Sequence, residues 1–290
     1  MIATVIQLQI MPDRVATQID YYGRHAVAWV GTYVLCEPED QDFYANEGVP
    51  PNAKRQLLVF SGTPVQLLDD AYILTAGHIF SKHLPIFDSR RAFQTGGSLA
   101  DCFGLKKWSN KYTKAFPYDF FQNCEYWIDD PDAGLDYAML KLSVNDTNLL
   151  KANGTIFYTP SQAHYNLTAI CRNLFLMGFP EEASELADWQ PGGETNIFSK
   201  PYLLPVFRDI ERETGRYQMI CGHLLNLHQL NSIVGMSGGP IFASIKNKTG
   251  TDYTLAGIQS SWIKRTGTIY ATRIDSIVEH FWAWKKQNAV

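Results

Sequence analysis

Short apolar runs separated by turn residues dominate the pattern of hydrophobic and polar positions along the chain. Residues 57–60 form one such run, and residues 67–72 place a polar turn between two further apolar stretches. Residues 136–142 form another run, and residues 215–262 return to the same pattern. Short apolar runs between turn residues are typical of buried strands. The pattern therefore predicts an all-β chain over most of its length.

The end of the chain has a different period. Apolar residues recur there at helical spacing, namely Ile274, Ile277, Val278, Phe281 and Trp282. This spacing predicts a C-terminal α-helix over residues 274–288. An amphipathic helix can lie on a membrane surface, but the basic face of this one is too thin for that role. We therefore expect the helix to pack on the protein, and we expect no membrane partner.

Several stretches lack a clear period. Residues 38–51 are acidic and contain proline, and residues 180–200 are rich in Glu, Pro and Gly, so both are predicted as exposed loops. Residues 81–132 are rich in aromatic residues but are punctuated by glycine and proline, which predicts a long loop. Residues 146–165 are expected to connect two halves of the chain. Residues 15–30 are the least readable, and a helix followed by a first strand fits them.

Composition and charge narrow the class of protein. The chain has 290 residues, of which 46% are hydrophobic and 19% are charged, which is enough apolar content for a sizeable core. Its formal net charge is −4, and it lacks the basic face that nucleic-acid binding normally requires. No apolar run reaches the length of a membrane span. We therefore expect neither a nucleic-acid partner nor a membrane-spanning protein.

The cysteines and the first residues bear on the compartment. The chain has five cysteines, Cys36, Cys102, Cys124, Cys171 and Cys221. The number is odd and no close pair has the spacing of metal ligands, so we expect free thiols and no metal site. The N-terminus has no basic segment before its apolar stretch, which makes it a poor secretory signal. We expect a cytoplasmic protein, with a secreted chain whose signal has been removed as the alternative.

Three separated motifs together predict a catalytic serine. Residues 74–78 read Leu-Thr-Ala-Gly-His, Asp136 directly precedes an apolar run, and residues 235–240 read Gly-Met-Ser-Gly-Gly-Pro. A serine hydroxyl is a poor nucleophile at neutral pH. It needs a base to take its proton, and the base needs an acid that holds it in the right tautomer. We therefore predict Ser237 as the nucleophile, His78 as the base and Asp136 as the orienting acid.

Residues next to these motifs bear on the same chemistry. Asp129, Asp130 and Asp132 compete for the role of the acid, but they lie in a proline-containing loop where solvation is expected. The backbone N–H groups of Gly235 and Ser237 are the predicted oxyanion donors. The glycine lets the chain turn sharply enough for both groups to point at one spot.

At these motifs the chain resembles the chymotrypsin/trypsin-like serine peptidases, in particular bacterial members. That family carries a similar histidine motif, an aspartate before a short apolar strand and a similar serine motif, in the same order. The resemblance covers about residues 55–290 and implies two six-stranded Greek-key β-barrels, at about residues 51–145 and 166–272. A peptidase domain would then span residues 51–290 and end in the helix, and residues 1–50 would form an N-terminal extension or a first segment.

The same resemblance implies a serine endopeptidase that acts on a protein or peptide substrate without a cofactor. Extended substrate would add as a strand along residues 258–262. Within this segment Ser260 is expected to hydrogen-bond Asp136, and Ser260, Ser261 and Trp262 are expected to bind substrate. Trp262 stands where the family normally has a glycine. Either the tryptophan narrows the pocket mouth, or a one-residue bulge shifts the register.

The base of the primary pocket is predicted by counting along the family's pattern. Six residues before Ser237 lies Asn231, beside Ser232, where trypsin-like enzymes carry an aspartate. Both residues are predicted to bind substrate. A neutral residue at the base offers no counter-charge to a buried cation, so cleavage after Arg or Lys is not expected.

Met236 departs from the family's usual motif. It replaces the acidic residue that pairs with a newly cut N-terminal amine in zymogen-derived members, so activation by that ion pair is excluded. Two alternatives to a constitutive enzyme stay open. One is a catalytically silent module that keeps the fold and binds a peptide. The other is a regulated enzyme that needs a protein partner to open its pocket.

Overall fold

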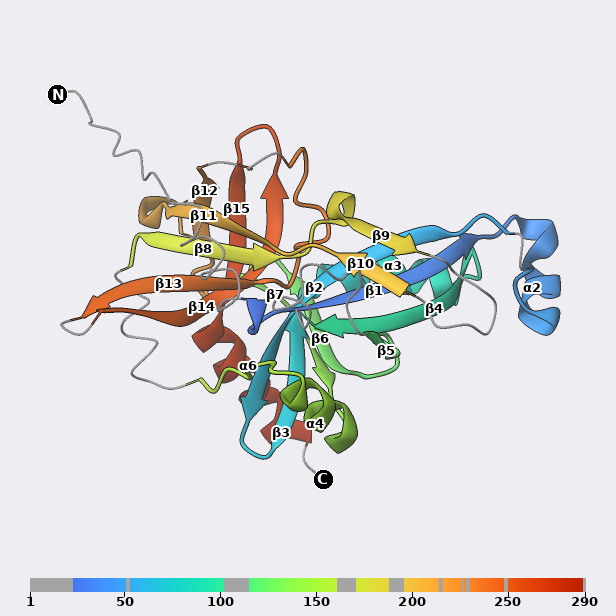
Figure 1. Ribbon diagram of the computed structural model, residues 1–290, viewed down its shortest axis with the longest axis horizontal. Coiled ribbons are helices and arrows are strands. Elements are labelled where there is room, and N and C mark those ends of the chain that lie inside the picture. The colour runs from blue at the N-terminus through green and yellow to red at the C-terminus, as the bar shows by residue number, and fades with distance from the viewer. Residues whose placement is uncertain are drawn as a thin grey trace.

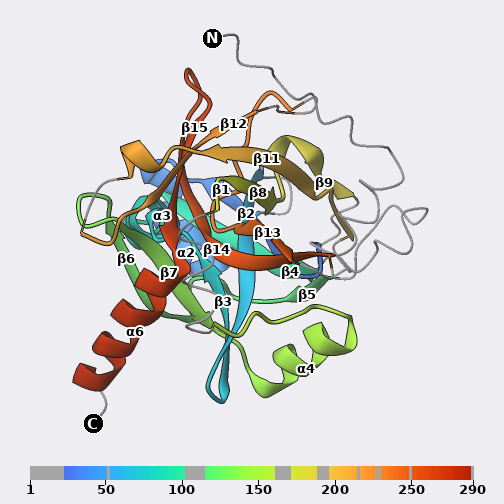
Figure 2. The same ribbon diagram turned by 90° about the vertical axis from the view of Figure 1, so that its left-hand side faces the viewer.

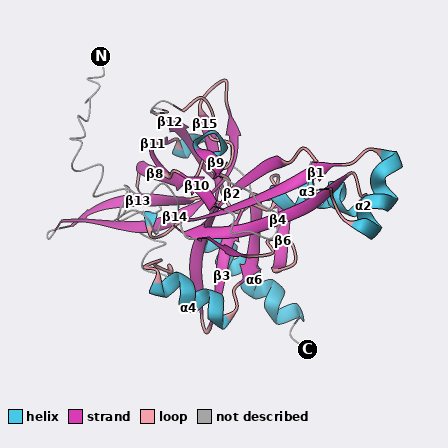
Figure 3. Ribbon diagram, turned by 45° about the vertical axis from the view of Figure 1, so that its right-hand side comes forward, coloured by secondary structure: helices cyan, strands magenta, loops and turns pink. Residues whose placement is uncertain are grey.

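In the computed structural model the chain forms two groups of β-strands with helices at the periphery (Figure 1, Figure 3). The structure describes residues 23–50, 53–101, 115–160, 171–187, 196–213, 216–225, 227, 230–247 and 250–288. Strands predominate in this part of the chain, which confirms the predicted all-β class.

The first group is a seven-stranded antiparallel sheet in the order β5-β4-β1-β2-β3-β7-β6. Its strands are β1 (Val27–Leu35), β2 (Gln56–Leu67), β3 (Asp70–Thr75), β4 (Ala92–Asp101), β5 (Ala115–Pro117), β6 (Cys124–Asp130) and β7 (Leu135–Lys141). The long strand β2 links the two parts of the sheet, because its first half pairs with β1 and its second half with β3. The sheet has one strand more than predicted for this half, and strand pairing within the described residues does not join β5 to β6.

The second group is a closed barrel in the order β11-β12-β15-β14-β13-β8. Its strands are β8 (Asn173–Gly178), β11 (Tyr202–Arg208), β12 (Ile220–Leu224), β13 (Pro240–Asn247), β14 (Gly250–Ile263) and β15 (Thr268–Arg273). Neighbouring strands are antiparallel around the barrel. The six-stranded barrel predicted for the second half is therefore confirmed.

Helices surround the strands (Figure 2, Figure 3). The α-helices of the described residues are α2 (Gln41–Glu47), α3 (His78–Asp88), α4 (Val144–Ala152) and α6 (Ile274–Asn288). Short 3₁₀-helices are η1 (Pro38–Asp40), η3 (Glu181–Ala183) and η4 (Ile210–Arg212). The predicted C-terminal helix is confirmed as α6. Within the described part of the chain, no helix combines the length and apolar character needed to cross a membrane.

One cluster of buried apolar residues joins the two strand groups and α6. It includes Tyr72 and Tyr137 from the first sheet, Ile258 from the barrel and Phe281 from α6. The rings of Tyr72 and Phe281 meet edge to face, with centroids 5.5 Å apart. Because burial of apolar surface is the dominant favourable term in folding, this shared core holds the loops of both groups in fixed relation.

Three segments predicted as loops contain regular structure. Residues 81–132 include most of α3 and all of β4, β5 and β6. Residues 180–200 form η3 and a hairpin of β9 (Ser184–Ala187) and β10 (Asn196–Ser199), and residues 38–51 hold η1 and α2. The loop predictions are therefore wrong for these segments. Pairing with distant strands decides elements such as β4, and no local period reveals a distant partner.

A buried tryptophan explains why β4 reads as a loop. Trp29 in β1 is 1% exposed, and its ring covers Gly31 and Gly97. A Cβ atom at Gly97 would lie 2.3 Å from the ring, so a larger residue does not fit there. The ring also stacks on Phe60 at a centroid distance of 5.7 Å. The glycines of this segment belong to a strand that makes room for an indole.

The described part of residues 1–50 belongs to the first sheet. β1 begins at Val27 and pairs with β2 on one side and β4 on the other. A strand at the end of residues 15–30 is thus present. The helix expected before it falls largely on residues 1–22, which lie outside the described residues.

Candidate active site

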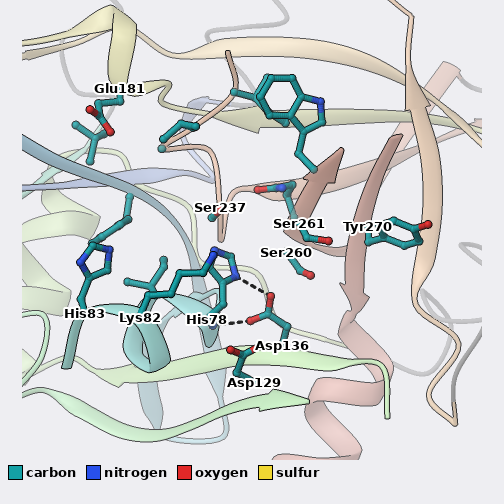
Figure 4. A pocket seen from close by; sticks show the side chains of 18 of the residues that line it. His78, Lys82, His83, Asp129, Asp136, Glu181, Ser237, Ser260, Ser261 and Tyr270 are labelled. Atoms are coloured by element: carbon teal, nitrogen blue, oxygen red, sulfur yellow. Dashed lines mark hydrogen bonds and ion pairs between the residues drawn. The ribbon is translucent and has the colours of Figure 1, made fainter. Parts of the chain in front are cut away.

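The residues of the three sequence motifs meet in one cleft of about 820 Å³ (Figure 4). His78 begins α3, Asp136 lies in β7 and Ser237 lies in the loop before β13, and all three line the cleft. The first sheet therefore supplies the histidine and the aspartate, and the barrel supplies the serine. Strands from the two halves of the chain form opposite walls of the cleft.

Asp136 holds His78 through two hydrogen bonds. The Asp136 Oδ2 atom lies 2.7 Å from His78 Nδ1, and Oδ1 accepts the His78 backbone N–H at 2.7 Å. The register of the sheet produces this contact, because Thr75 at the end of β3 lies opposite Ala138 of β7. Engagement of Nδ1 orients the imidazole and leaves Nε2 as the nitrogen available for proton transfer.

The carboxyl of Asp136 is ionised at neutral pH. Burial by itself would raise its pKa, since the residue is only 4% exposed. Hydrogen bonds and charge from His78, with a further hydrogen bond from Ser260, outweigh burial and hold the pKa below its usual value. The competing Asp129 is exposed and accepts a hydrogen bond from Ser81. Asp136 is therefore the carboxylate that can stabilise a His78 imidazolium.

Thr272 of the barrel holds the backbone of Asp136 in place. Thr272 Oγ1 accepts the Asp136 N–H at 3.1 Å and donates to the Asp136 carbonyl at 3.0 Å. Ser260, also in the barrel, lines the same cleft and contributes to the lowered pKa of the carboxyl. Thr272 lies in β15, so the predicted orienting acid of the first sheet is fixed from the other half of the chain.

Two consecutive turns shape the loop that carries Ser237. One backbone hydrogen bond closes each turn, donated by Met236 at 3.0 Å and by Gly239 at 2.9 Å. The third residue of each turn is a glycine with positive φ, Gly235 at 93° and Gly238 at 85°. Type II turns have this dihedral, which strains residues with a Cβ atom. The glycines of the motif thus set the conformation that presents the serine.

The backbone N–H groups predicted as oxyanion donors have no hydrogen-bond acceptor within the described residues. Among the described residues, the N–H groups of Met236, Gly238 and Gly239 all donate backbone hydrogen bonds, whereas those of Gly235 and Ser237 donate none. Two unclaimed N–H groups beside a nucleophilic hydroxyl can stabilise the oxyanion of a tetrahedral intermediate.

Strand β2 fixes the serine loop from the first sheet. Ser61 Oγ donates to the Gly235 carbonyl at 2.8 Å, and Thr63 Oγ1 donates to the Gly238 carbonyl at 3.0 Å. Ser61 Oγ also accepts the N–H of Phe179 at 2.8 Å. These buried side chains satisfy both turn carbonyls and thereby fix the orientation of the turns.

The peptide before Gly235 has its own restraint. The carbonyl of Val234 accepts the N–H of Glu181 in η3 at 2.8 Å. Because the carbonyl and N–H of a trans peptide point in opposite directions, this bond directs the Gly235 N–H away from η3. The first oxyanion donor is therefore held in orientation by a backbone contact.

Met236 is fully buried in the barrel core. A Cβ atom at Gly178 in β8 would lie 3.0 Å from the Met236 Cβ atom, which shows how closely the loop packs on that strand. The residue between the two oxyanion donors is thus anchored by apolar packing. No ion pair with an N-terminal amine is needed to hold it.

The wall formed by β14 carries three predicted substrate residues. Ser260, Ser261 and Trp262 all line the cleft. The register between β14 and β15 shifts between Gln259 and Ser261, so a bulge lies at Ser260. The bulge places Trp262 opposite Ile269. A one-residue bulge is therefore present in this segment, and Trp262 beyond it lines the cleft.

The predicted base of the pocket does not line the cleft. Asn231 is exposed, and neither it nor Ser232 is among the lining residues. The backbone N–H of Asn231 donates to Glu182 Oε1 at 2.6 Å, and that of Ser232 lies 3.4 Å from the same atom. The next residue, Ile233, is buried and lines the cleft. The counted pocket base is therefore corrected, because the chain turns toward Glu182 and presents Ile233 instead.

Ser237 and His78 face the same space without a direct bond. Hydrogen bonds within the described residues include none between the Ser237 hydroxyl and the His78 ring, although Figure 4 shows the two side chains next to each other. Catalytic hydrogen bonds are often long in the absence of substrate and shorten in the complex. The arrangement is compatible with proton transfer once a substrate fills the cleft.

Sequence reasoning missed several residues that line the cleft, namely Lys82, His83, Glu181, Met219, Gln259 and Tyr270. The ring of His83 packs on that of Phe60 at a centroid distance of 5.4 Å, and burial, with the charges of Lys82 and His78, lowers its pKa. Gln259 had a signal in the sequence, because it is a polar residue at the end of the apolar run 255–258.

The His, Cys, Asp and Glu side chains in the part of the chain that the structure describes bear on metal binding and on disulfide bonds. Among the described residues, no group of three or more His, Cys, Asp and Glu side chains is placed to hold a metal ion. Cysteines 36, 124, 171 and 221 are free, and the fifth, at position 102, lies outside the described residues.

No family model matches the sequence, and the curated proteins include no match. Solved structures with a similar chain path include a thermostable serine protease, AL20, from an extremophilic microorganism, at 14% identity and a TM-score of 0.41 over 84% of this chain and 90% of that one. Protease Anisep from Arthrobacter nicotinovorans is 15% identical, with a TM-score of 0.41 over 86% and 90%. A Glu endopeptidase is 12% identical, with a TM-score of 0.44 over 92% and 93%. Because these values are low, we infer function from the site itself.

Proposed function

We propose that the protein is a serine endopeptidase that hydrolyses peptide bonds by acyl transfer, with Ser237 as the nucleophile. One combination carries this proposal. A buried carboxylate orients His78 in the same cleft as Ser237, and the N–H groups of Gly235 and Ser237 are unclaimed beside it. A serine in a glycine-rich turn with only a structural role would need neither feature.

The chemistry follows from these positions. His78 Nε2 takes the proton of the Ser237 hydroxyl as the oxygen attacks the substrate carbonyl carbon, and ionised Asp136 stabilises the resulting imidazolium. The oxyanion accepts hydrogen bonds from the N–H groups of Gly235 and Ser237. The imidazolium then protonates the leaving amine as the C–N bond breaks. In the second half, His78 takes a proton from water as the water oxygen attacks the acyl carbon, and the imidazolium returns this proton to Ser237 Oγ as the ester C–O bond breaks and the acid product leaves.

A strand edge beside the nucleophile suits an extended substrate. The last residue of β14 that pairs with β13 is Ile258, opposite Pro240, whereas β14 continues to Ile263. Gln259 pairs with the serine loop, so the edge beyond it stays open within the described residues. A peptide added along this edge would gain backbone hydrogen bonds whatever its sequence, and its carbonyl would lie next to Ser237.

Labelling with a fluorophosphonate probe tests the proposal. We expect one modified residue, Ser237, located by peptide mass spectrometry. The Ser237→Ala variant should not react, whereas Ser89→Ala, which removes an exposed serine, should react like the parent protein.

Two outcomes would point to the rival functions. No labelling of the parent protein under any condition would indicate a catalytically silent peptide-binding module. Labelling only in the presence of a second protein would indicate an enzyme regulated by a partner. Labelling at a different serine would contradict the assignment of the nucleophile.

A further inference from the structure

Gln259 is a buried amide in the wall of the cleft whose oxygen lacks a partner. The residue is 1% exposed and lines the cleft, and its Oε1 atom accepts no hydrogen bond from any described residue. Almost all buried polar side-chain atoms are hydrogen-bonded, and an unsatisfied one costs free energy comparable to a lost hydrogen bond. An exception inside a binding cleft calls for a ligand group that completes the bond.

The backbone places this amide beside the nucleophile. The Gly238 N–H donates to the Gln259 carbonyl at 2.7 Å, and the Gln259 N–H donates to the Gly239 carbonyl at 2.9 Å. On the other side, Gln259 pairs with Ala271 of β15. Because Gly238 and Gly239, which follow Ser237, are both hydrogen-bonded to Gln259, the backbone of Gln259 is held in place beside the serine loop.

We propose that Gln259 determines primary specificity by hydrogen-bonding the side chain of the residue whose carbonyl Ser237 attacks, and that this side chain is a carboxamide, glutamine or asparagine. The proposal rests on the proposed endopeptidase function. It names the class of substrate that the cleft accepts.

The surroundings of Gln259 favour a neutral side chain. In Figure 4, Ser261 and Tyr270 lie on the opposite side of Ser237 from Lys82 and Glu181. Ile233 and Met219 add apolar surface to the cleft. None of these four side chains, Ser261, Tyr270, Ile233 and Met219, carries a charge, so a charged substrate side chain buried among them would gain no ion pair from them, which is costly.

The chemistry of the amide selects a carboxamide. An acceptor such as Gln259 Oε1 needs a donor, and a carboxylate has none when ionised. A carboxamide has a donor end and an acceptor end, so it can pair with the Gln259 amide whichever way that amide is turned. The same wall also holds an unsatisfied donor, Trp262 Nε1, which is buried and lacks a partner among the described residues. A group that both donates and accepts therefore complements this wall better than one that does only one of these.

The test compares peptides that differ only at the residue before the cleaved bond. Glutamine is set against glutamate and methionine, which have nearly the same size, and against lysine. With the parent protein we expect kcat/KM to be about tenfold to hundredfold higher for glutamine than for glutamate or methionine, as expected when a buried polar group regains its partner. Asparagine should follow glutamine more closely than aspartate does.

Substitution of Gln259 should change the preference for glutamine before the cleaved bond. In Gln259→Met the preference for glutamine over methionine should disappear or reverse, while Ser237 keeps its fluorophosphonate reactivity. Gln122→Met, which makes the same substitution at an exposed glutamine outside the cleft, should keep the glutamine preference. If Gln259→Met does not fold, the profile of the parent protein still decides the matter.

The failures of the two proposals have different signatures. Labelling at Ser237 together with a profile that favours lysine, glutamate or apolar residues over glutamine and asparagine would overturn the role of Gln259 and leave the endopeptidase intact. A glutamine preference unchanged in Gln259→Met would do the same. Absence of labelling and of cleavage would overturn the proposed function, and the specificity with it.

Discussion

The two halves of the molecule hold each other's residues of the proposed catalytic site, but they do so by different means. The barrel holds the aspartate of the first sheet through Thr272, which bonds both its backbone N–H and its backbone carbonyl. The first sheet in turn holds the serine loop of the barrel, through Ser61 and Thr63 on its turn carbonyls. Neither half contains a complete site, so the site forms only when the two halves are packed together.

The difference between the halves lies in the kind of interaction. The His78–Asp136 pair depends on a buried charge and on hydrogen bonds to it. The serine loop depends on neutral hydrogen bonds, on glycine conformation and on the burial of Met236. The contribution of the His78–Asp136 pair to stability should therefore depend on pH, and that of the serine loop should depend on side-chain volume.

The largest effect should come from removing either side of the reacting pair, because His78 and Ser237 act as a unit across the two halves. Ser237→Ala or His78→Ala should each lower kcat by roughly a millionfold, and Asp136→Asn by roughly ten-thousandfold. The double variant should be no worse than either single one. Turnover of a cleaved peptide is measured for the parent protein, the three single variants and the Ser237→Ala/His78→Ala double variant. Additive losses of kcat in the double variant would show that the two residues act separately.

Packing of the serine loop should matter next. Met236→Ala leaves a cavity in the barrel core and should lower the free energy of unfolding by about 2–5 kcal/mol. Met236→Leu conserves volume and should cost less than about 1.5 kcal/mol. Urea unfolding of both variants gives the comparison. Equal stability of the two variants would mean that burial of this residue does not anchor the loop.

A glycine that touches the other half should matter slightly less. A Cβ atom at Gly238 would lie 2.2 Å from Thr75 Oγ1 and 2.3 Å from the Ser61 carbonyl oxygen. Gly238→Ala should therefore cost about 2–4 kcal/mol, from crowding and from its positive φ. Gly154→Ala is the matched control, because Gly154 also has positive φ but has nothing within 4 Å of its Cβ position. Similar unfolding free energies for the two variants would remove the steric argument.

The charged pair should show itself as a pH dependence. The pKa of Asp136 is lowered in the folded protein, so its contribution to stability is present above the unfolded pKa and is lost as pH falls through the folded value. The stability difference between the parent protein and Asp136→Asn should be constant near neutral pH and should shrink below about pH 4. Urea unfolding at several pH values measures it, with the exposed Asp132→Asn as control. If the stability difference shrank as pH rises toward neutral, the pKa of Asp136 would be raised on folding and not lowered.

The smallest effect should come from a reducing agent. The four described cysteines are free, so the two halves are joined by packing and hydrogen bonds. The melting temperature and the labelling of Ser237 should be essentially unchanged by reductant. A native disulfide typically contributes about 2–4 kcal/mol, so a fall of several degrees in the melting temperature on reduction would show that a disulfide stabilises the protein.

By itself, the sequence determined the features that are encoded within a few neighbouring residues. Short apolar runs predicted strands, and helical spacing predicted α6. The motifs around His78, Asp136 and Ser237 identified the residues that meet in the cleft. Local patterns succeed here because strand alternation, helix period and the turns of a glycine motif depend on nearby residues only.

Only the tertiary structure decided which distant groups face one another. The glycines of β4 suggest a loop in the sequence, and only the structure shows that Gly97 makes room for the ring of Trp29 in β1. Likewise, only the structure shows that the backbone of Asn231 donates to Glu182, so that Asn231 does not form the base of the pocket. The hydrogen bond from Ser61 to the Gly235 carbonyl also joins residues far apart in the chain. The lack of a partner for Gln259 Oε1 likewise depends on which distant residues pack around it. The physical reason is that a hydrophobic pattern specifies which side of an element is buried, whereas the partner across the core depends on how every other element packs.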